Sequence, residues 1–191
     1  MKSIKGSETE KNLLKAFAGE SQARNRYTYF SSVARKDGFE QISGIFLETA
    51  DNEKEHAKVF FDFLEGGEVV IEAGYPAGKL GTTLENLLVS AAGERMEWTT
   101  LYQGFAEKAR GEGFTDVYAA FKQIAEVEQK HETRYNKLIA NVQQGSVFVK
   151  DKVVKWKCRN CGYVHEGPEA PLLCPACKHP QAYYEIFTEP Y

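Results

Sequence analysis

Two copies of one short pattern, Glu53 to His56 and Glu128 to His131, constrain this chain more than any other feature. Each copy places a Glu three residues before a His, and the second copy follows the first by 75 residues (128 − 53). Residues i and i+3 share one face of an α-helix, so each copy directs a carboxylate and an imidazole to one point. Nearly the same offset relates Glu20 to Glu94. The sequence therefore predicts a duplicated pair of helices around a shared polar centre.

Helix start and stop signals divide most of the chain into four helical segments. The first expected helix runs from Ser7 to Asp37, and the second follows after almost no loop, has Ile42 as its first seam residue and ends at Gly66. The third and fourth run from Thr82 to Gly111 and from Thr115 to Gly145. The buried seam of the third helix is expected to hold Leu87, Ser90, Glu94, Glu97 and Leu101. The glycine-rich stretch 66–81 is too long for a tight hairpin, so we expect a crossover connection there. Two hairpins joined by a long crossover are the topology of ferritin-like four-helix bundles.

Seven ionisable residues fall on seam positions that apolar or small residues otherwise occupy: Glu20, Glu53, His56, Glu94, Glu97, Glu128 and His131. Burying an ionised carboxylate costs free energy unless it is paired or bound to metal. The seams carry no Lys or Arg that could balance the charges of the five glutamates. Two divalent cations would neutralise four carboxylates, and mixed carboxylate and imidazole ligands suit iron or manganese. One Glu-x-x-His pattern alone is usually a solvated helix face, but this set matches the ligands of dimetal bundles.

Glu97 is an additional carboxylate, three residues after Glu94. A minimal dimetal bundle needs no ligand there, but a fifth carboxylate helps to balance two trivalent ions. We expect Glu97 to bind metal in the oxidised state and to leave on reduction, with His56 taking its place. The alternative is a surface glutamate on a rotated helix.

Tyr27 and Tyr102 lie one to two helical turns from Glu20 and Glu94. They are expected to donate hydrogen bonds to ligand carboxylates. A role as ordinary core tyrosines is the alternative, and a redox-active tyrosyl is a third possibility.

All four cysteines lie near the C-terminus in two Cys-x-x-Cys pairs: Cys158, Cys161, Cys174 and Cys177. Such pairs form a tetrahedral four-sulfur site that fits zinc or a single iron, and the spacing alone favours a zinc ribbon. The Cys-Gly-Tyr and Cys-Pro-x-Cys surroundings resemble rubredoxin knuckles, which favours iron with zinc as a possible substitute. His165 and His179 are expected to be exposed and not to bind the metal.

The change in pattern near residue 148 predicts two domains. Residues 1–148 are expected to form an all-α ferritin-like bundle, and residues 149–191 a small rubredoxin-like domain of strands and loops. Short strands are expected at 147–149 and 153–156. About forty residues are too few to fold on a hydrophobic core alone, so the bound metal must stabilise the second domain.

Composition limits the partners. The net charge of −3 offers no basic surface for nucleic acid. The sequence contains no apolar run of membrane-spanning length and no charged leader followed by an apolar segment. The expectation is a cytoplasmic protein with no nucleic-acid or membrane partner.

The bundle with paired Glu-x-x-His patterns, the extra Glu97 and the C-terminal cysteine pairs together resemble the rubrerythrin family over essentially the whole chain. The resemblance implies two non-haem irons bridged by Glu53 and Glu128, with Glu20 and Glu94 as terminal ligands. It implies that His131 holds one iron and that Glu97 and His56 exchange at the other. Tyr27 and Tyr102 would hydrogen-bond to this ligand set.

The resemblance also implies an activity. Family members reduce hydrogen peroxide to water, and the cysteine-bound iron returns the electrons. These electrons would come from reduced rubredoxin or from a separate NAD(P)H-dependent reductase. A separate donor is expected because no Gly-x-Gly-x-x-Gly stretch, the pattern typical of nucleotide binding, follows a strand in this sequence. A homodimer with head-to-tail contact between domains is implied as well.

Three other classes stay open at this point. A ferroxidase or iron-storage protein would use the same helices but not the four cysteines. An oxygen-reducing oxidase or hydroxylase would react faster with oxygen than with peroxide. A zinc-ribbon protein with a structural bundle would be colourless.

Overall fold

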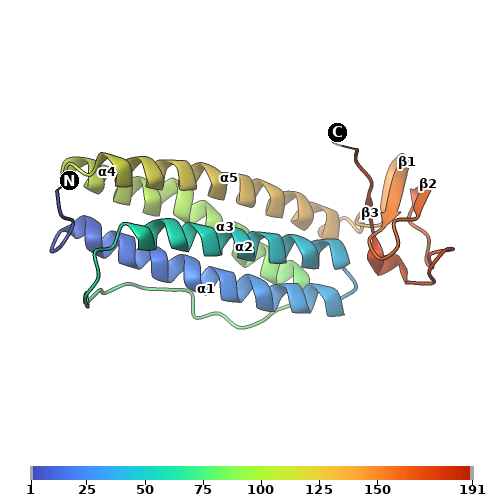
Figure 1. Cartoon of the computed structure of the whole chain (residues 1–191). Helices are drawn as coiled ribbons and strands as arrows, with labels where there is room; N and C mark the ends of the chain where they lie inside the picture. The colour runs from blue at the N-terminus through green and yellow to red at the C-terminus, as the bar shows by residue number, and fades with distance from the viewer. Residues whose placement is uncertain (1, 190–191) are drawn as a thin grey trace.

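The computed structural model describes residues 2–189, and Figure 1 shows a long helical bundle with a small strand-containing unit at one end. Residue 1 and residues 190–191 of the predicted domain ranges lie outside the described part. The mostly helical ferritin-like architecture with a C-terminal strand region is as predicted. Within the described residues, no helix is both long and apolar enough to cross a membrane.

The bundle is built from two helical hairpins. The helices are α1 (Glu8–Lys36), α2 (Glu40–Asp62), α3 (Thr83–Met96), α4 (Tyr102–Gly111) and α5 (Thr115–Gln143). α1 packs on α2, and both α3 and α4 pack on α5. The helix starts predicted from capping signals are confirmed: the Ser7 hydroxyl accepts a hydrogen bond from the Glu10 N–H, and Thr82 forms a reciprocal capping box with Glu85.

The third predicted helix is not continuous. A π-helical turn, η1 (Glu97–Leu101), separates α3 from α4. The prediction that Leu101 lies on the buried seam is therefore wrong: Leu101 is half-buried, and Tyr102 is the fully buried residue that follows Glu94. A π-turn holds one residue more than an α-helical turn, which shifts the buried face by one position.

The bundle has two apolar clusters with a polar layer between them. One cluster contains Leu13, Phe60 and Phe121, and the other contains Phe30 and Phe46. The predicted carboxylates and imidazoles occupy the layer between, so water is kept away from them on both sides along the bundle axis.

The crossover connects α2 to α3 without helix or strand over residues 66–81, as predicted. It runs back along the bundle as an extended segment (Figure 1). The Tyr75 hydroxyl donates a hydrogen bond to the Lys15 carbonyl at 2.9 Å, which ties the segment to α1.

The C-terminal unit is a three-stranded antiparallel sheet of order β2-β1-β3. Its strands are β1 (Val149–Cys158), β2 (Val164–Glu169) and β3 (Tyr184–Ile186), and a short 3-10 turn, η2 (Gln181–Tyr183), precedes β3. One ten-residue strand replaces the two short strands predicted between residues 147 and 156, because β2 pairs with it from Val149 to Lys157, and β3 pairs with its last three residues. Only five residues form its buried core: Trp156, Cys158, Ala170, Cys174 and Tyr184.

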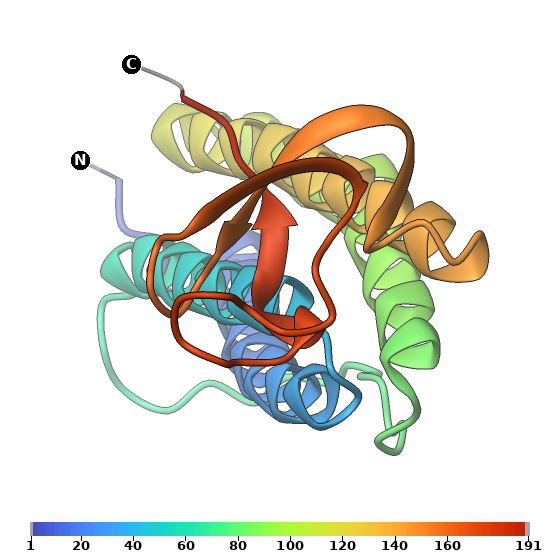
Figure 2. The ribbon, with the colours of Figure 1, turned by 90° about the vertical axis from the view of Figure 1, so that its right-hand side faces the viewer.

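This sheet packs on the end of the bundle where α1 turns into α2, as the end-on view in Figure 2 shows. The rings of Phe39 and Phe148 stack at 6.1 Å and 9°. The Arg159 guanidinium lies against Gly44, where a Cβ would be 2.6 Å from its Nη2 atom. The division at residues 148 and 149 into separate domains stays a prediction.

Candidate metal centres

Every main helix of the bundle contributes to one buried cluster. α1 supplies Glu20, α3 supplies Glu94, and α2 and α5 each supply a Glu-x-x-His pair. The side chains form two groups that could each hold a metal ion: Glu20, Glu53, His56 and Glu128, and Glu53, Glu94, Glu128 and His131. Within each group the candidate ligand atoms lie within 4.8 Å of one another. Glu53 and Glu128 belong to both groups, so two ions would share them.

The two groups are related by an approximate symmetry. The Nδ1 atom of His56 lies 2.8 Å from carboxylate oxygens of both Glu53 and Glu128, and 4.0 Å from Glu20. The Nδ1 atom of His131 lies 2.8 Å from Glu128 and 3.3 Å from Glu53. Each imidazole therefore faces both shared carboxylates from its own side.

The donor set fits a pair of cations. The buried atoms Glu20 Oε2, Glu53 Oε1, Glu94 Oε2, both oxygens of Glu128 and His131 Nδ1 make no well-aligned hydrogen bond, although imidazole nitrogens lie as close as 2.8 Å to the oxygens of Glu128. Buried polar atoms in folded proteins are nearly always paired, and unpaired ones cost free energy. Oxygen and imidazole donors around a dry centre are ligands that iron and manganese accept. The side chains thus leave their lone pairs directed at places where metal ions would lie.

Without cations, the charges of the cluster compensate one another through protons. Burial opposes protonation of His56, but the contacts with Glu128 and Glu53 outweigh it and raise the pKa of His56 to about 10. The same balance raises the pKa of His131 to about 9. In the opposite sense, burial is outweighed at Glu128 by the two imidazoles, which lower its pKa to about 2.

Glu20 and Glu94, the outer carboxylates, each belong to one group only, and their pKa values shift in the opposite direction to that of Glu128. Burial and the charges on Glu53 and Glu128 raise the pKa values of Glu20 and Glu94 well above the usual range. These two groups resist ionisation unless a cation is supplied, which is the expected property of buried carboxylates that serve as ligands.

Two tyrosines hold the outer carboxylates across the bundle. The Tyr27 hydroxyl donates to Glu94 Oε1 at 2.6 Å, and the Tyr102 hydroxyl donates to Glu20 Oε1. Each tyrosine therefore orients a carboxylate from the opposite helical hairpin. Both phenols are almost completely buried.

Glu97 lies beside the cluster and not in it. It is half-buried and belongs to neither group of candidate ligands. Together with Arg26 and Tyr102 it lines a cavity under the crossover. Burial and the charges on Glu128 and Glu53 raise the pKa of Glu97 to about 8. Its position is that of a carboxylate adjacent to the centre, at the first residue of the π-turn η1.

Sequence reasoning missed one partner of the cluster. Asn52 Oδ1 lies 3.3 Å from His131 Nε2, the ring nitrogen that faces away from the shared carboxylates. An outer partner of this kind fixes the orientation of a ligating imidazole. A position directly before Glu53 carries no periodic signal of its own, so only the structure identifies Asn52.

The four cysteines form a second centre, whose candidate ligand atoms lie within 4.8 Å of one another. Cys158 and Cys177, and likewise Cys161 and Cys174, have Sγ atoms 3.7 Å apart. A backbone N–H from His179 is the main cause that lowers the pKa of Cys177 to about 6, which favours the thiolate that a metal needs.

The two histidines of this unit are not members of the cysteine group. The prediction that they are exposed is wrong: both His165 and His179 are half-buried. The ring of His179 packs edge-on against Tyr183, with ring centroids 4.6 Å apart. His165 lies in β2 opposite Trp156, whereas His179 lies in the loop after Cys177.

Comparison with known proteins agrees with both centres. A family model described as Rubrerythrin matches residues 11–139 and 85–158, and one described as the rubredoxin-like domain of rubrerythrin matches residues 156–185. A rubrerythrin of Porphyromonas gingivalis is 62% identical over 96% of this chain and 92% of that protein. A rubrerythrin of Nitratidesulfovibrio vulgaris is 57% identical over 97% of each chain.

Solved structures agree with this assignment. Fully reduced, all-ferrous nigerythrin is 31% identical with a TM-score of 0.64, covering 95% of this chain and 87% of that one. Symerythrin from Cyanophora paradoxa, at 21% identity and a TM-score of 0.61, shares the fold over 75% of this chain and 89% of its own. Matches of this extent, to family models and to relatives of the same length, show that the chain belongs to the rubrerythrin family.

Proposed function

We propose that this protein is a non-haem diiron peroxidase that reduces hydrogen peroxide to water and protects the cell against oxidative stress. The family supports an oxidoreductase role in oxidative stress defence. The observation that carries the more specific proposal is the pair of buried groups that share Glu53 and Glu128, in one chain with a four-cysteine site.

The geometry supports the proposed ligand roles. Glu53 and Glu128 would bridge two irons, because both belong to both groups. Glu20 with His56, and Glu94 with His131, would complete the two ends. These last four belong to one group each.

Glu97 would exchange with His56 at one iron as the oxidation state changes. Its place beside the cluster supports this role, since a half-buried carboxylate on a π-turn can approach or leave the centre with a small rotation.

When bound, two ferrous ions would supply the two electrons and the template that peroxide reduction requires. The protein side chains prepare the site for them. Tyr27 and Tyr102 fix the outer carboxylates, and Asn52 fixes the ring of His131. The apolar clusters at both ends of the polar layer exclude bulk water.

The four-cysteine iron would relay electrons to the bundle, supplied by reduced rubredoxin or by an NAD(P)H-dependent reductase. In one chain the cysteine unit contacts α2 at Gly44, nine residues before Glu53. That separation is about 14 Å of helix. In a homodimer with head-to-tail contact, the cysteine unit of one copy would approach the dimetal cluster of the other. This arrangement would shorten the distance over which electrons pass from the four-cysteine iron to the dimetal cluster.

The test is stopped-flow oxidation of the fully reduced protein by hydrogen peroxide and, separately, by oxygen. We expect the peroxide reaction to be the faster one. A much faster reaction with oxygen would instead indicate an oxygen-reducing or ferroxidase protein. An absorption spectrum of the oxidised protein checks the relay, since a four-thiolate ferric centre is red and a zinc site is colourless.

A further inference from the structure

Two adjoining cavities lie between α1, α3 and the crossover segment. The inner cavity, of about 290 Å³, is lined by Glu97 and Tyr102 and therefore borders the metal centre. The outer cavity, of about 310 Å³, borders Tyr27. The residues that line both are Gln22, Arg26, Pro76 and Gly93.

The cavities are larger than hydrogen peroxide requires. Each water molecule takes about 30 Å³ of liquid volume, so a molecule of two oxygens needs about 60 Å³. Either cavity has several times that volume. Pockets of about 300 Å³ and more are of the size that organic ligands occupy.

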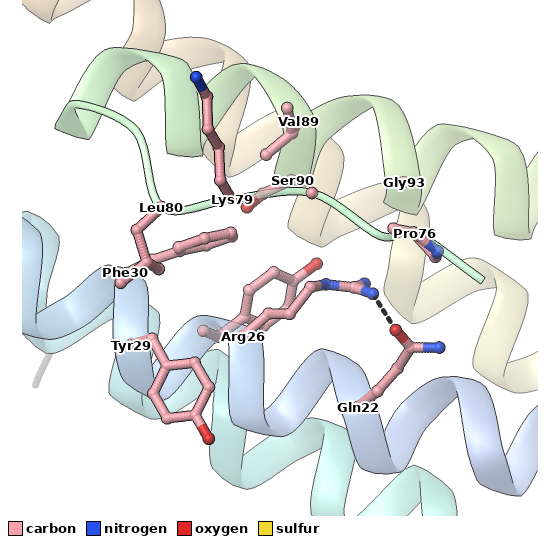
Figure 3. A pocket seen from close by; sticks show the side chains of 12 residues that line it. Gln22, Arg26, Tyr29, Phe30, Pro76, Lys79, Leu80, Val89, Ser90 and Gly93 are labelled. Atoms are coloured by element: carbon pink, nitrogen blue, oxygen red, sulfur yellow. Dashed lines mark hydrogen bonds between the residues drawn. The ribbon is translucent and has the colours of Figure 1, made fainter.

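The lining is also mainly apolar. Met96, Leu101 and Phe105 form part of the inner wall. Phe30, Leu80 and Val89 form part of the outer wall, and Figure 3 shows Phe30 and Leu80 close together at one end. Apolar walls contribute nothing to the recognition of hydrogen peroxide, whereas they favour a hydrocarbon group.

Two polar residues, Gln22 and Arg26, lie where the two cavities meet. Other polar side chains line one cavity only, among them Lys15 and Glu72 in the inner cavity and Lys79 in the outer one. Arg26 Nη1 donates to Gln22 Oε1 at 2.6 Å, as the dashed line in Figure 3 marks. Glu97 and Tyr102 lie at the inner wall. A ligand with a polar end and an apolar body would place its polar end toward the metal centre and its body toward the outer cavity.

We propose that the protein also reduces organic hydroperoxides, whose hydrocarbon group lies in these two cavities beneath the crossover. This inference rests on the proposed function, since it uses the same metal centre and the same two electrons. The reaction is R–O–O–H + 2 e⁻ + 2 H⁺ → R–OH + H₂O. The O–O bond breaks, one oxygen leaves as water and the other remains on the alcohol.

The test compares hydrogen peroxide with cumene hydroperoxide in the iron-loaded full-length protein. Gly93 is the position to change, because it lines both cavities and a Cβ there would meet nothing within 4 Å. In Gly93→Leu the new side chain starts from open space at its Cβ and would take up part of both cavities. We expect kcat/KM for cumene hydroperoxide to fall by about tenfold or more, since excluding an apolar group from its pocket has effects of this size. The value for hydrogen peroxide should stay nearly unchanged.

A second measurement does not depend on turnover. Cumyl alcohol, the redox-inert product, should bind to the oxidised wild-type protein in calorimetry and should bind much more weakly to Gly93→Leu. The matched control is Gly104→Leu, at an exposed helical glycine whose Cβ also meets nothing within 4 Å. This control should behave as wild type in both measurements.

The outcomes separate the two proposals. A wild type that reduces neither hydroperoxide overturns the proposed function. A wild type that reduces hydrogen peroxide but neither reduces cumene hydroperoxide nor binds cumyl alcohol overturns only this inference. Equal behaviour of Gly93→Leu and Gly104→Leu would also overturn it.

Discussion

At the scale of single residues, the tyrosine hydroxyl groups determine how the outer carboxylates are presented. Tyr102 donates to Glu20, and Tyr27 donates to Glu94, in both cases from the other helical hairpin. The second oxygen of each carboxylate has no hydrogen-bond partner. One oxygen is therefore fixed by a phenol while the other stays available to a metal ion.

Replacing Tyr102 with Phe should weaken metal binding without unfolding the bundle. The ring keeps its packing against Phe60 and Phe121, but Glu20 loses the hydrogen bond that orients it. Loss of an outer partner of this kind typically costs about 10- to 100-fold in metal affinity. Competition titrations with a coloured chelator would measure the change.

The matched variant for the other half of the centre is Tyr27→Phe, which releases Glu94 in the same way. Both variants should keep the helical circular dichroism of wild type. Unchanged affinity in both would mean that the phenols only fill space in the core.

At this scale the sequence predicted the clustered carboxylates and imidazoles and their two tyrosine partners, and missed Asn52. The repeated Glu-x-x-His pattern was sufficient because each carboxylate and imidazole sits on a helical seam, where periodicity reports burial directly. Asn52 carries no such signal, because its contact with His131 depends on how two helices meet. The expectation that Glu97 binds metal stays a prediction, since Glu97 lies beside the cluster.

At the scale of elements, the π-turn sets the direction of α4. Tyr102 follows Glu94 by eight residues (102 − 94). A regular α-helix advances about 100° per residue, so eight residues would leave Tyr102 about 80° away from the buried face. The extra residue in η1 makes the offset equivalent to seven, which returns Tyr102 to that face. Sequence periodicity assumes a constant helical turn and therefore placed Leu101 there.

Deleting Thr100, an exposed residue of η1, should convert this region into a continuous α-helix. Tyr102 would then follow Glu94 by seven residues and stay buried, so the variant should fold with an unfolding temperature equal to or above that of wild type. Glu97 would lose the wide turn at its own position, so reoxidation by peroxide should be slower. Thermal unfolding and stopped-flow measurements check both parts, and failure to fold would contradict the register argument.

A carboxylate at the end of α4 stabilises the start of α1. Glu112 accepts hydrogen bonds from the Thr9 hydroxyl and from the N–H groups of Thr9 and Glu8. Slight burial opposes ionisation, but these hydrogen bonds outweigh it and lower the pKa of Glu112. Its stabilising effect is therefore present above the ordinary carboxyl pKa and is lost as pH falls through the lowered value.

The variant Glu112→Gln should weaken this cap by up to about 1 kcal/mol near neutral pH. Amide hydrogen exchange at Thr9 gives a local measure, and protection there should fall in the variant. The difference from wild type should shrink as pH drops below about 4.3, where carboxylates become protonated. Glu107→Gln, at an exposed position of the same helix, is the control and should leave Thr9 unaffected.

At the scale of the whole molecule, the two centres depend on their surroundings to different degrees. The dimetal cluster lies between two large apolar clusters, each with twelve buried residues, that pack the helices together. The cysteine unit has five buried core residues, and two of them, Cys158 and Cys174, belong to the site itself. The short length of the segment after residue 148 predicted this dependence, whereas the single long strand β1 could not be predicted, because its continuity depends on pairing with β2.

Removing the metal site should therefore unfold the C-terminal unit and leave the bundle folded. Structural metal sites contribute about 10–16 kcal/mol to small metal-dependent folds, far more than five buried side chains supply. The double variant Cys161→Ser, Cys174→Ser, made in a Trp98→Phe background, leaves Trp156 as the single tryptophan. Trp156 is fully buried and donates to the Gly167 carbonyl at 3.0 Å, so its fluorescence should shift to the red on exposure.

Limited proteolysis of the same double variant should cut after residue 148 while the helical circular dichroism stays close to that of the Trp98→Phe parent. The parent itself should resist cleavage and keep its blue-shifted emission, because its four cysteines still bind metal. If Trp156 stays buried in the double variant, the strands fold on their own contacts with the bundle at Phe39 and Gly44. In that case the metal would serve electron transfer and would not be needed for the fold.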